Sequence, residues 1–195
     1  MRTFGFVFLV VLLGAGFGCQ KSPPPPKPDL LAHWHFAGTE VVKATTNGTL
    51  LKTILAQPET RTLVHQTLDK LARAPFARLQ QHLPGQTNDC ADRLRPLLED
   101  LTEAESFFQM RGTSNQVPEW TLAVRLPQDR AEVWRTNLAE TLSLWTGVGA
   151  TNKNPSGLPG WQLKKHDAPN LLGLIRVGEW VLVGAGQDRL SLLDE

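Results

Sequence analysis

The chain has 195 residues, of which 41% are hydrophobic and 20% are charged, close to the average for globular proteins. This composition excludes a wholly disordered chain and a fibrous repeat. The 20 basic and 19 acidic residues give a formal net charge of +1, without the large basic excess typical of nucleic-acid binding. We therefore expect no nucleic-acid partner.

The first feature along the chain is an uncharged, apolar run at residues 4–18, preceded by Arg2. A helix that spans a bilayer needs about 20 apolar residues, so this run is short for an anchor. A basic residue, a short apolar run and then small residues are the layout of an export signal. An ordinary cleaved signal peptide and an uncleaved anchor remain alternatives to the interpretation that follows.

The run ends in Gly16-Phe17-Gly18-Cys19, which resembles the lipobox of bacterial lipoproteins. In that family, signal peptidase II cuts before the Cys, which then carries the lipid. The resemblance implies that residues 1–18 are a signal peptide and that Cys19 is the acylated (palmitate-bearing) residue. Gly16 departs from the family pattern, which usually has Leu at that position, and Phe17 is bulkier than usual.

Residues 19–28 contain a run of prolines, which can form neither helix nor sheet and favours an extended polyproline helix. At about 3.1 Å per residue, this tether would hold a folded domain roughly 25–30 Å from a membrane surface. A lipid on Cys19 would make the membrane a partner of the protein. Gln20 after Cys19 favours attachment to the outer membrane if the host has one, and otherwise we expect attachment at the cell surface. With Cys19 acylated, Cys90 is the only remaining thiol, so we expect no intramolecular disulfide.

The elements from residue 29 onward follow from hydrophobic periodicity. We expect a strand at 30–36, with Ala32, Trp34 and Phe36 on one face and Trp34 at a core position, and then four helices. These helices begin after Asn47-Gly48, at Pro58, at Pro75 and at Asn88 or Asp89. A period of two then predicts strands at 106–111 and 120–126, followed by a helix from Asp129, strands at 161–165, 171–177 and 180–183, and a last helix at 188–193.

This order predicts an α+β fold with a mainly antiparallel sheet and amphipathic helices packed on one face. Gly178-Glu179 suits a two-residue hairpin turn between the last two strands. Residues 29–195 are expected to form a single α+β domain, and the alternative is the front part of a larger architecture. The segments 30–36 and 120–193 resemble large uncharacterised bacterial envelope proteins, in which a strand–Gly–Glu/Asp–Trp–strand–Gly motif recurs. That resemblance implies fold and location only and brings no catalytic residues.

The best candidate for chemistry is the pair His33 and His35. Side chains two apart on a strand share a face, so two imidazoles could bind one metal ion. The alternative, which we favour, is that both histidines lie on the more solvent-exposed face of the strand and bind no metal. Several other candidates are weaker: a paired acid/base site at Glu99 and Glu103, Cys90 as a nucleophile, Gly184-Ala185-Gly186 as a dinucleotide-binding turn, and Trp120, Trp161 and Trp180 as a carbohydrate or peptide platform.

Because Cys90 falls on the apolar stripe of its helix, we expect it to be a small buried hydrophobe. The glycine segment lacks the third Gly of the fingerprint, since Arg189 occupies that position. We therefore expect no catalytic residues and no cofactor. The sequence favours a lipid-anchored, non-catalytic envelope protein that binds or scaffolds an envelope partner. The alternatives are a metal-dependent envelope hydrolase using His33 and His35 and a relic without a function of its own.

Overall fold

The computed structural model describes residues 29–45, 48–79, 89–112, 117–152, 157–164 and 171–186. Within these ranges the chain forms five helices and one six-stranded antiparallel sheet, which confirms the expected α+β class. The signal peptide, Cys19, the Pro-rich tether and the last expected helix lie outside the described residues. Among those residues, no helix combines the length and the apolar character needed to cross a bilayer.

The sheet has the strand order β1-β2-β3-β6-β5-β4, and every neighbouring pair is antiparallel. Gly178 has φ of +61°, a conformation that suits glycine at the first position of the predicted two-residue turn between β5 and β6. The strand bounds are β1 (Asp29–Phe36), β2 (Ser106–Gly112), β3 (Glu119–Arg125), β4 (Gly160–Lys164), β5 (Leu171–Val177) and β6 (Trp180–Gly186).

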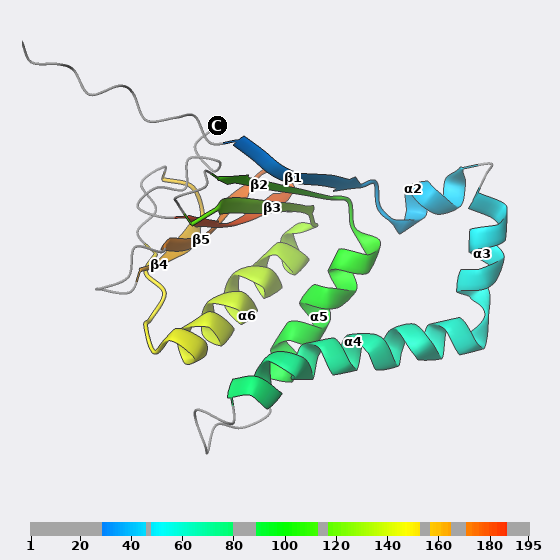
Figure 1. Ribbon diagram of the computed structural model, residues 1–195, viewed down its shortest axis with the longest axis horizontal. Coiled ribbons are helices and arrows are strands. Elements are labelled where there is room, and N and C mark those ends of the chain that lie inside the picture. The colour runs from blue at the N-terminus through cyan, green and yellow to red at the C-terminus, as the bar shows by residue number, and fades with distance from the viewer. Residues whose placement is uncertain are drawn as a thin grey trace, which may run out of the picture.

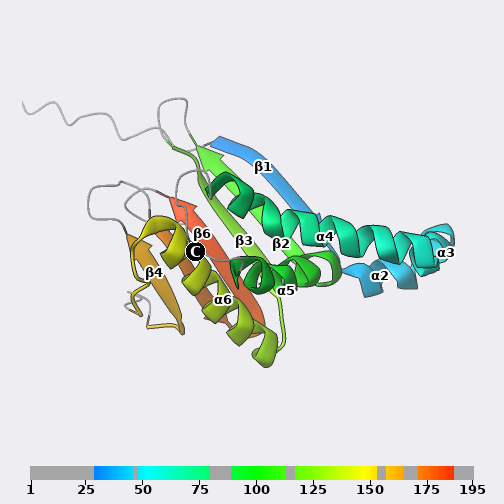
Figure 2. The same cartoon turned by 90° about the horizontal axis from the view of Figure 1, so that it is seen from below.

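The helices are α2 (Thr39–Ala44), α3 (Thr49–Ala56), α4 (Pro58–Leu79), α5 (Asp89–Glu103) and α6 (Gln128–Thr146). Helices α5 and α6 cover one face of the sheet, as predicted, and α4 packs against α5 (Figure 1). Helices α2 and α3 project beyond the sheet, and α4 returns from them toward it (Figure 2). We call α2, α3 and α4 together the helical arm.

The core lies between the sheet and helices α5 and α6. Strand alternation sends every second side chain of β3, β4, β5 and β6 toward these helices, where the ring of Trp134 is also buried. The indole N–H of Trp161 donates a 2.9 Å hydrogen bond to the backbone oxygen of Arg135, so this large polar ring is buried without an unpaired donor. The buried cluster comprises Leu97, Val124, Leu126, Ala131, Trp134, Trp161, Leu163, Leu174, Val181 and Val183.

Several sequence predictions are wrong in detail. Pro75 begins no new helix but lies inside α4, which continues to Leu79 without the backbone hydrogen bond that a proline cannot donate. Helix α2 was not predicted. Trp34 was expected in the core but is 47% exposed, because β1 is an edge strand that the helices do not fully cover. Trp161, one of the three tryptophans considered for an exposed platform, lies at the start of β4 but is 1% exposed and belongs to the core.

Candidate functional site: a groove beside the helical arm

A groove of about 1030 Å³ lies between the helical arm, α5 and the turn that joins β3 to α6. Charged and polar side chains of the helical arm and α5 line it together with apolar side chains of α3, α4 and the turn, which offer a contact area for another apolar surface. The apolar residues are Leu55 and Ala56 of α3, Val64 and Leu68 of α4, and Leu126 and Pro127 of the turn.

The helical arm exposes an unusual share of apolar surface. Neither α2 nor α3 has a buried residue. Of the 13 large hydrophobic side chains that are exposed among the described residues, seven lie on the arm, and Leu50 reaches 72% exposure. Of these residues, Val64 lines the groove and the others lie elsewhere on the arm. The seven are Val41, Leu50, Leu51, Ile54, Leu63, Val64 and Leu71.

The arm also carries the positive charge of the molecule. Residues 39–79 contain six basic and three acidic residues, a formal charge of +3, whereas the rest of the chain contains 14 basic and 16 acidic residues. Lys43 is paired with Glu40 at 2.9 Å, and this hydrogen bond lowers the pKa of the Glu40 carboxyl. Lys52 and Arg61 line the groove; Lys52 also acts on Glu40 by charge alone, and no hydrogen bond or ion pair of either side chain occurs among the described residues.

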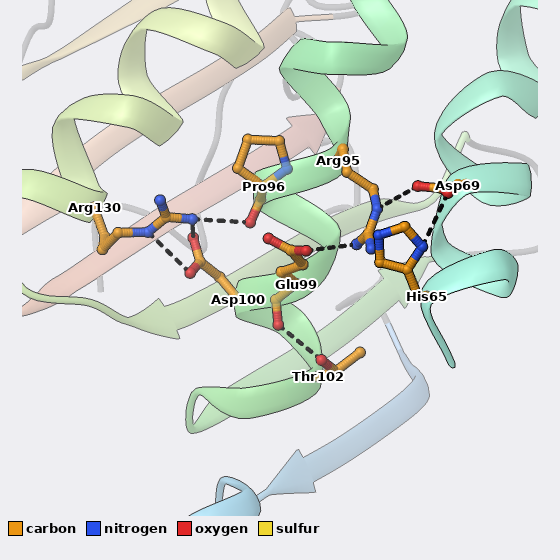
Figure 3. Close-up of polar contacts among 8 residues, drawn as sticks. All are labelled: His65, Asp69, Arg95, Pro96, Glu99, Asp100, Thr102 and Arg130. Carbon is orange, nitrogen blue, oxygen red and sulfur yellow. Dashed lines mark hydrogen bonds and ion pairs between the residues drawn. The ribbon is translucent and has the colours of Figure 1, made fainter. Parts of the chain in front are cut away.

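Two arginines that line the groove pair with carboxylates of neighbouring helices (Figure 3). Arg95 of α5 donates from Nε to Asp69 of α4 at 2.7 Å and lies 2.9 Å from the carboxylate of Glu99. The hydrogen bond from Arg95 holds the pKa of Asp69 below its usual value. Because Arg95 lies on α5 and Asp69 on α4, this ion pair joins the arm to α5 beside the groove.

The second arginine joins α5 to α6. Arg130 donates from Nε and Nη2 to the two carboxylate oxygens of Asp100, at 3.1 and 2.9 Å, and also to the backbone oxygen of Pro96 at 3.0 Å. The hydrogen bond to Asp100 raises the pKa of Arg130. The same carboxylate accepts a 2.8 Å hydrogen bond from the indole of Trp134, so Asp100 connects the groove to the core.

The predicted metal ligands lie elsewhere, on the sheet face away from the helices. His35 has Nε2 at 3.2 Å from Glu105, and its ring stacks on Phe107 with 4.0 Å between centroids. His33 lies opposite Gln109 in the sheet. Among the described residues, no three or more His, Cys, Asp and Glu side chains are grouped so that they could hold a metal ion.

The other candidates are dispersed. Cys90 is 2% exposed, which agrees with its predicted role as a small buried hydrophobe. Glu99 and Glu103 both line the groove, but Glu99 pairs with Arg95 rather than acting as a free base. The segment Gly184–Gly186 is the end of an antiparallel strand and not the strand-to-helix turn of a dinucleotide site.

Sequence reasoning missed the groove. The sequence predicts amphipathic helices packed on the sheet, because periodicity shows that a helix face is apolar and not what covers it. The available signal was the excess of basic residues in 39–79 combined with a short helix rich in leucine.

No protein-family model, no curated protein and no solved structure matches this chain. The geometry of the groove therefore carries the functional interpretation.

Proposed function

We propose that this protein is a lipid-anchored, non-catalytic binding protein of the bacterial envelope. Its occupant is an amphipathic helical segment of another envelope protein, held in the groove beside the helical arm. The observation that carries this proposal is the groove itself, about 1030 Å³ with apolar and charged side chains in its lining, beside an arm rich in exposed apolar side chains. An amphipathic helix laid into an apolar groove is a recurring mode of peptide recognition.

Charge supports an occupant with acidic residues beside its apolar face. Lys52 and Arg61 line the groove without a hydrogen bond or ion pair among the described residues, and the arm as a whole carries a formal charge of +3. Complementary charge speeds association and selects the partner more than it adds affinity. The occupant would therefore place carboxylates against these two cations and apolar side chains on the groove lining.

The sequence at 1–28 supports the location. An apolar run, Cys19 in a lipobox-like motif and a Pro-rich tether fit acylation and display from a membrane. A tethered binding protein meets membrane-bound partners at a high effective concentration, so modest intrinsic affinity is enough. Replacing Cys19 by Ser should leave an uncleaved precursor without acyl mass. Normal maturation of Cys19→Ser would remove the lipoprotein part of the proposal.

The groove is tested by site-specific photo-crosslinking in cells that make the full-length chain. A photo-reactive side chain at Val64, which lines the groove and is 39% exposed, should capture a discrete protein. The matched position is Leu144 on α6, which is 40% exposed and does not line the groove. Mass spectrometry of the adduct should place the crosslink in a helical segment with an acidic, amphipathic pattern.

Charge reversal at the groove provides a second test of the same proposal. Lys52→Glu combined with Arg61→Glu should reduce the Val64 adduct by about tenfold or more, because like charges now face each other across the contact. Lys70→Glu is the control, since Lys70 is exposed on α4 but does not line the groove. Any of three results would refute the proposed groove function. Val64 and Leu144 could give equal amounts of adduct, the adducts could contain only lipid, or the double charge reversal could leave the amount of Val64 adduct unchanged.

A further inference from the structure

The outer edge of β1 is open among the described residues. This strand lies at one end of the six-stranded sheet, where it pairs with β2 alone, and six of its eight residues are exposed. Figure 2 shows β1 at the margin of the sheet. In the part of the chain that the structure describes, no backbone hydrogen bond reaches its outer side. A row of backbone N–H and C=O groups on a sheet edge is a template for one kind of occupant, another extended strand.

The other edge of the sheet is shorter and partly covered. Strand β4 has five residues, against eight in β1. Its middle residue, Gln162, exchanges two backbone hydrogen bonds with Thr151 on the side away from β5, at 2.7 and 2.8 Å. The structure therefore leaves β1 as the longer and more accessible edge for pairing with another chain.

The composition of β1 does not oppose such pairing. Natural edge strands often carry lysine, proline or inward-pointing charges that prevent edge-to-edge association. Residues 30–36 contain no proline and no Asp, Glu, Lys or Arg, and Leu30, Leu31 and Trp34 are 58%, 53% and 47% exposed. A register shift between Leu30 and Ala32 interrupts the start of the strand. Residues 32–36 then pair with β2 in regular register, so this stretch is the part of the edge suited to a new partner.

We propose that β1 pairs with β1 of a second copy of this chain, antiparallel and across a two-fold axis at Trp34. The regular stretch of five residues is centred on Trp34, so this register pairs all of them. Ala32 of each copy then lies opposite Phe36 of the other, a small side chain against a large one. The two Trp34 side chains meet at the axis, and cross-strand aromatic pairs stabilise a sheet. The same patch serves both copies, which is the commonest geometry of a protein dimer.

The side chains around the axis are compatible with this register. The register across β2, β3 and β6 places Trp34 on the same face of the sheet as Val183 of the core. On the other face, His33 of each copy lies opposite His35 of the other. The His35 ring is held toward β2, because it stacks on Phe107 with 4.0 Å between centroids. The pairing therefore rests on backbone hydrogen bonds and the Trp34 pair, without a metal ion.

A second copy is favoured over other strands because the chain before Asp29 brings copies together. The proposed acylation of Cys19 confines every copy to one membrane surface, which raises the effective concentration for pairing. A two-fold axis perpendicular to the sheet places both copies of Asp29 at the same height, about 33 Å apart. Residues 19–28 span about 30 Å, so both tethers reach the same surface. This step rests on the proposed lipid anchor. None of the residues that line the groove lies on β1, so the pairing is independent of the proposed groove function.

Disulfide trapping in the full-length chain, purified in detergent, tests the register. Residues directly opposite in an antiparallel pair have Cβ atoms about 4.5–5.5 Å apart, close to disulfide reach, whereas diagonal neighbours are about 7–8 Å apart. Under mild oxidation, Trp34→Cys should therefore form a covalent dimer in excess of the parent, which carries Cys19 and the buried Cys90. The controls are His35→Cys, one position along β1, and Leu144→Cys, which is 40% exposed on α6. Both should form much less covalent dimer.

Sedimentation equilibrium of the parent in density-matched detergent needs no substitution, so it decides the proposal even if a variant fails to fold. We expect a dimer. Trp34→Lys should weaken self-association by about tenfold or more, because the aromatic pair is lost and two like charges lie opposite each other at the axis. Leu144→Lys should self-associate like the parent.

Several results would overturn the proposal. They are a monomeric parent, a dimer that Trp34→Lys leaves unchanged, and equal trapping at Trp34, His35 and Leu144. A photo-reactive side chain at Trp34 that captures a strand of another protein, in place of a second copy, would also overturn it.

Discussion

Replacing Asp100 by Ala removes the carboxylate that joins α5 to α6. In the parent this side chain is 14% exposed and accepts hydrogen bonds from Arg130 at 3.1 and 2.9 Å and from the indole of Trp134 at 2.8 Å. We expect Asp100→Ala to lower the free energy of unfolding substantially, because Trp134 is 3% exposed and its N–H would lose its partner.

The magnitude follows from these contacts. An unpaired buried donor costs about 1–3 kcal/mol, and a lost hydrogen bond to a charged group about 1.5–3 kcal/mol. The second value is discounted because Arg130 is 32% exposed, so water can solvate its guanidinium, and because it keeps its bond to the backbone of Pro96. A loss of about 3 kcal/mol results, which for a chain of this size corresponds to a Tm lower by roughly 6–12 °C.

Urea unfolding of the full-length chain, followed by tryptophan fluorescence, measures this loss. Glu99→Ala is the control: Glu99 is one residue away on the same helix, but it is 50% exposed, and its pair with Arg95 should contribute less than about 1 kcal/mol. Asp100→Asn should be nearly as harmful as Asp100→Ala, because both oxygens accept hydrogen bonds and the amide NH₂ must face a donor. If Asp100→Ala costs no more than Glu99→Ala, the carboxylate does not hold α5 to α6.

Three further predictions concern packing, pH and metal. Gly160→Ala should destabilise the sheet by about 1–3 kcal/mol in urea unfolding, because the added Cβ would meet the backbone of β5. Asp69→Asn should lower stability at neutral pH, because the hydrogen bond from Arg95 stabilises the charged carboxylate and so depresses the pKa of Asp69. This stabilisation is lost as the pH falls below the ordinary pKa of 3.8. The difference in urea midpoint between the parent and Asp69→Asn should therefore become smaller in acid. One equivalent of zinc should leave the Tm of the full-length chain unchanged, because His35 is engaged by Glu105 and no further ligand group accompanies His33 among the described residues.

Each of these has a control or a contrary result. Gly149→Ala adds a Cβ with no atom within 4 Å, so a loss equal to that of Gly160→Ala would show that packing against β5 is not the cause. A constant gap between parent and Asp69→Asn across the acid range would contradict the role of the ion pair. A zinc-dependent rise in Tm that disappears in the double variant His33→Ala/His35→Ala would favour the metal-dependent hydrolase instead.

Local patterns predicted most of the secondary structure correctly. The alternation in β2, β3, β5 and β6 and the Gly178-Glu179 turn depend on neighbours along the chain, and the sheet follows them closely. Local patterns could not place β1 at an edge, because strand order depends on distant pairing. The exposure of Trp34 follows from that order, since an edge position leaves its ring only partly covered.

The candidate site was less predictable, for a related reason. An apolar stripe such as Leu50, Leu51 and Ile54 reads the same whether another element covers it or not. The pairing of Arg95 with Asp69 joins residues 26 positions apart, and that of Arg130 with Asp100 joins residues 30 apart. Neither pairing has a sequence signature. Only the packing of α4, α5 and α6 brings these charges together and leaves the groove between them.

The edge position of β1 has a mechanical consequence. Tension carried by the chain before Asp29 enters the molecule through β1, which is paired with β2 alone. A pull on Asp29 would open the β1–β2 pairs one after another, beginning opposite Gly112, while the other five strands stay paired. Release of the 8 residues of β1 would lengthen the tether by about 25 Å.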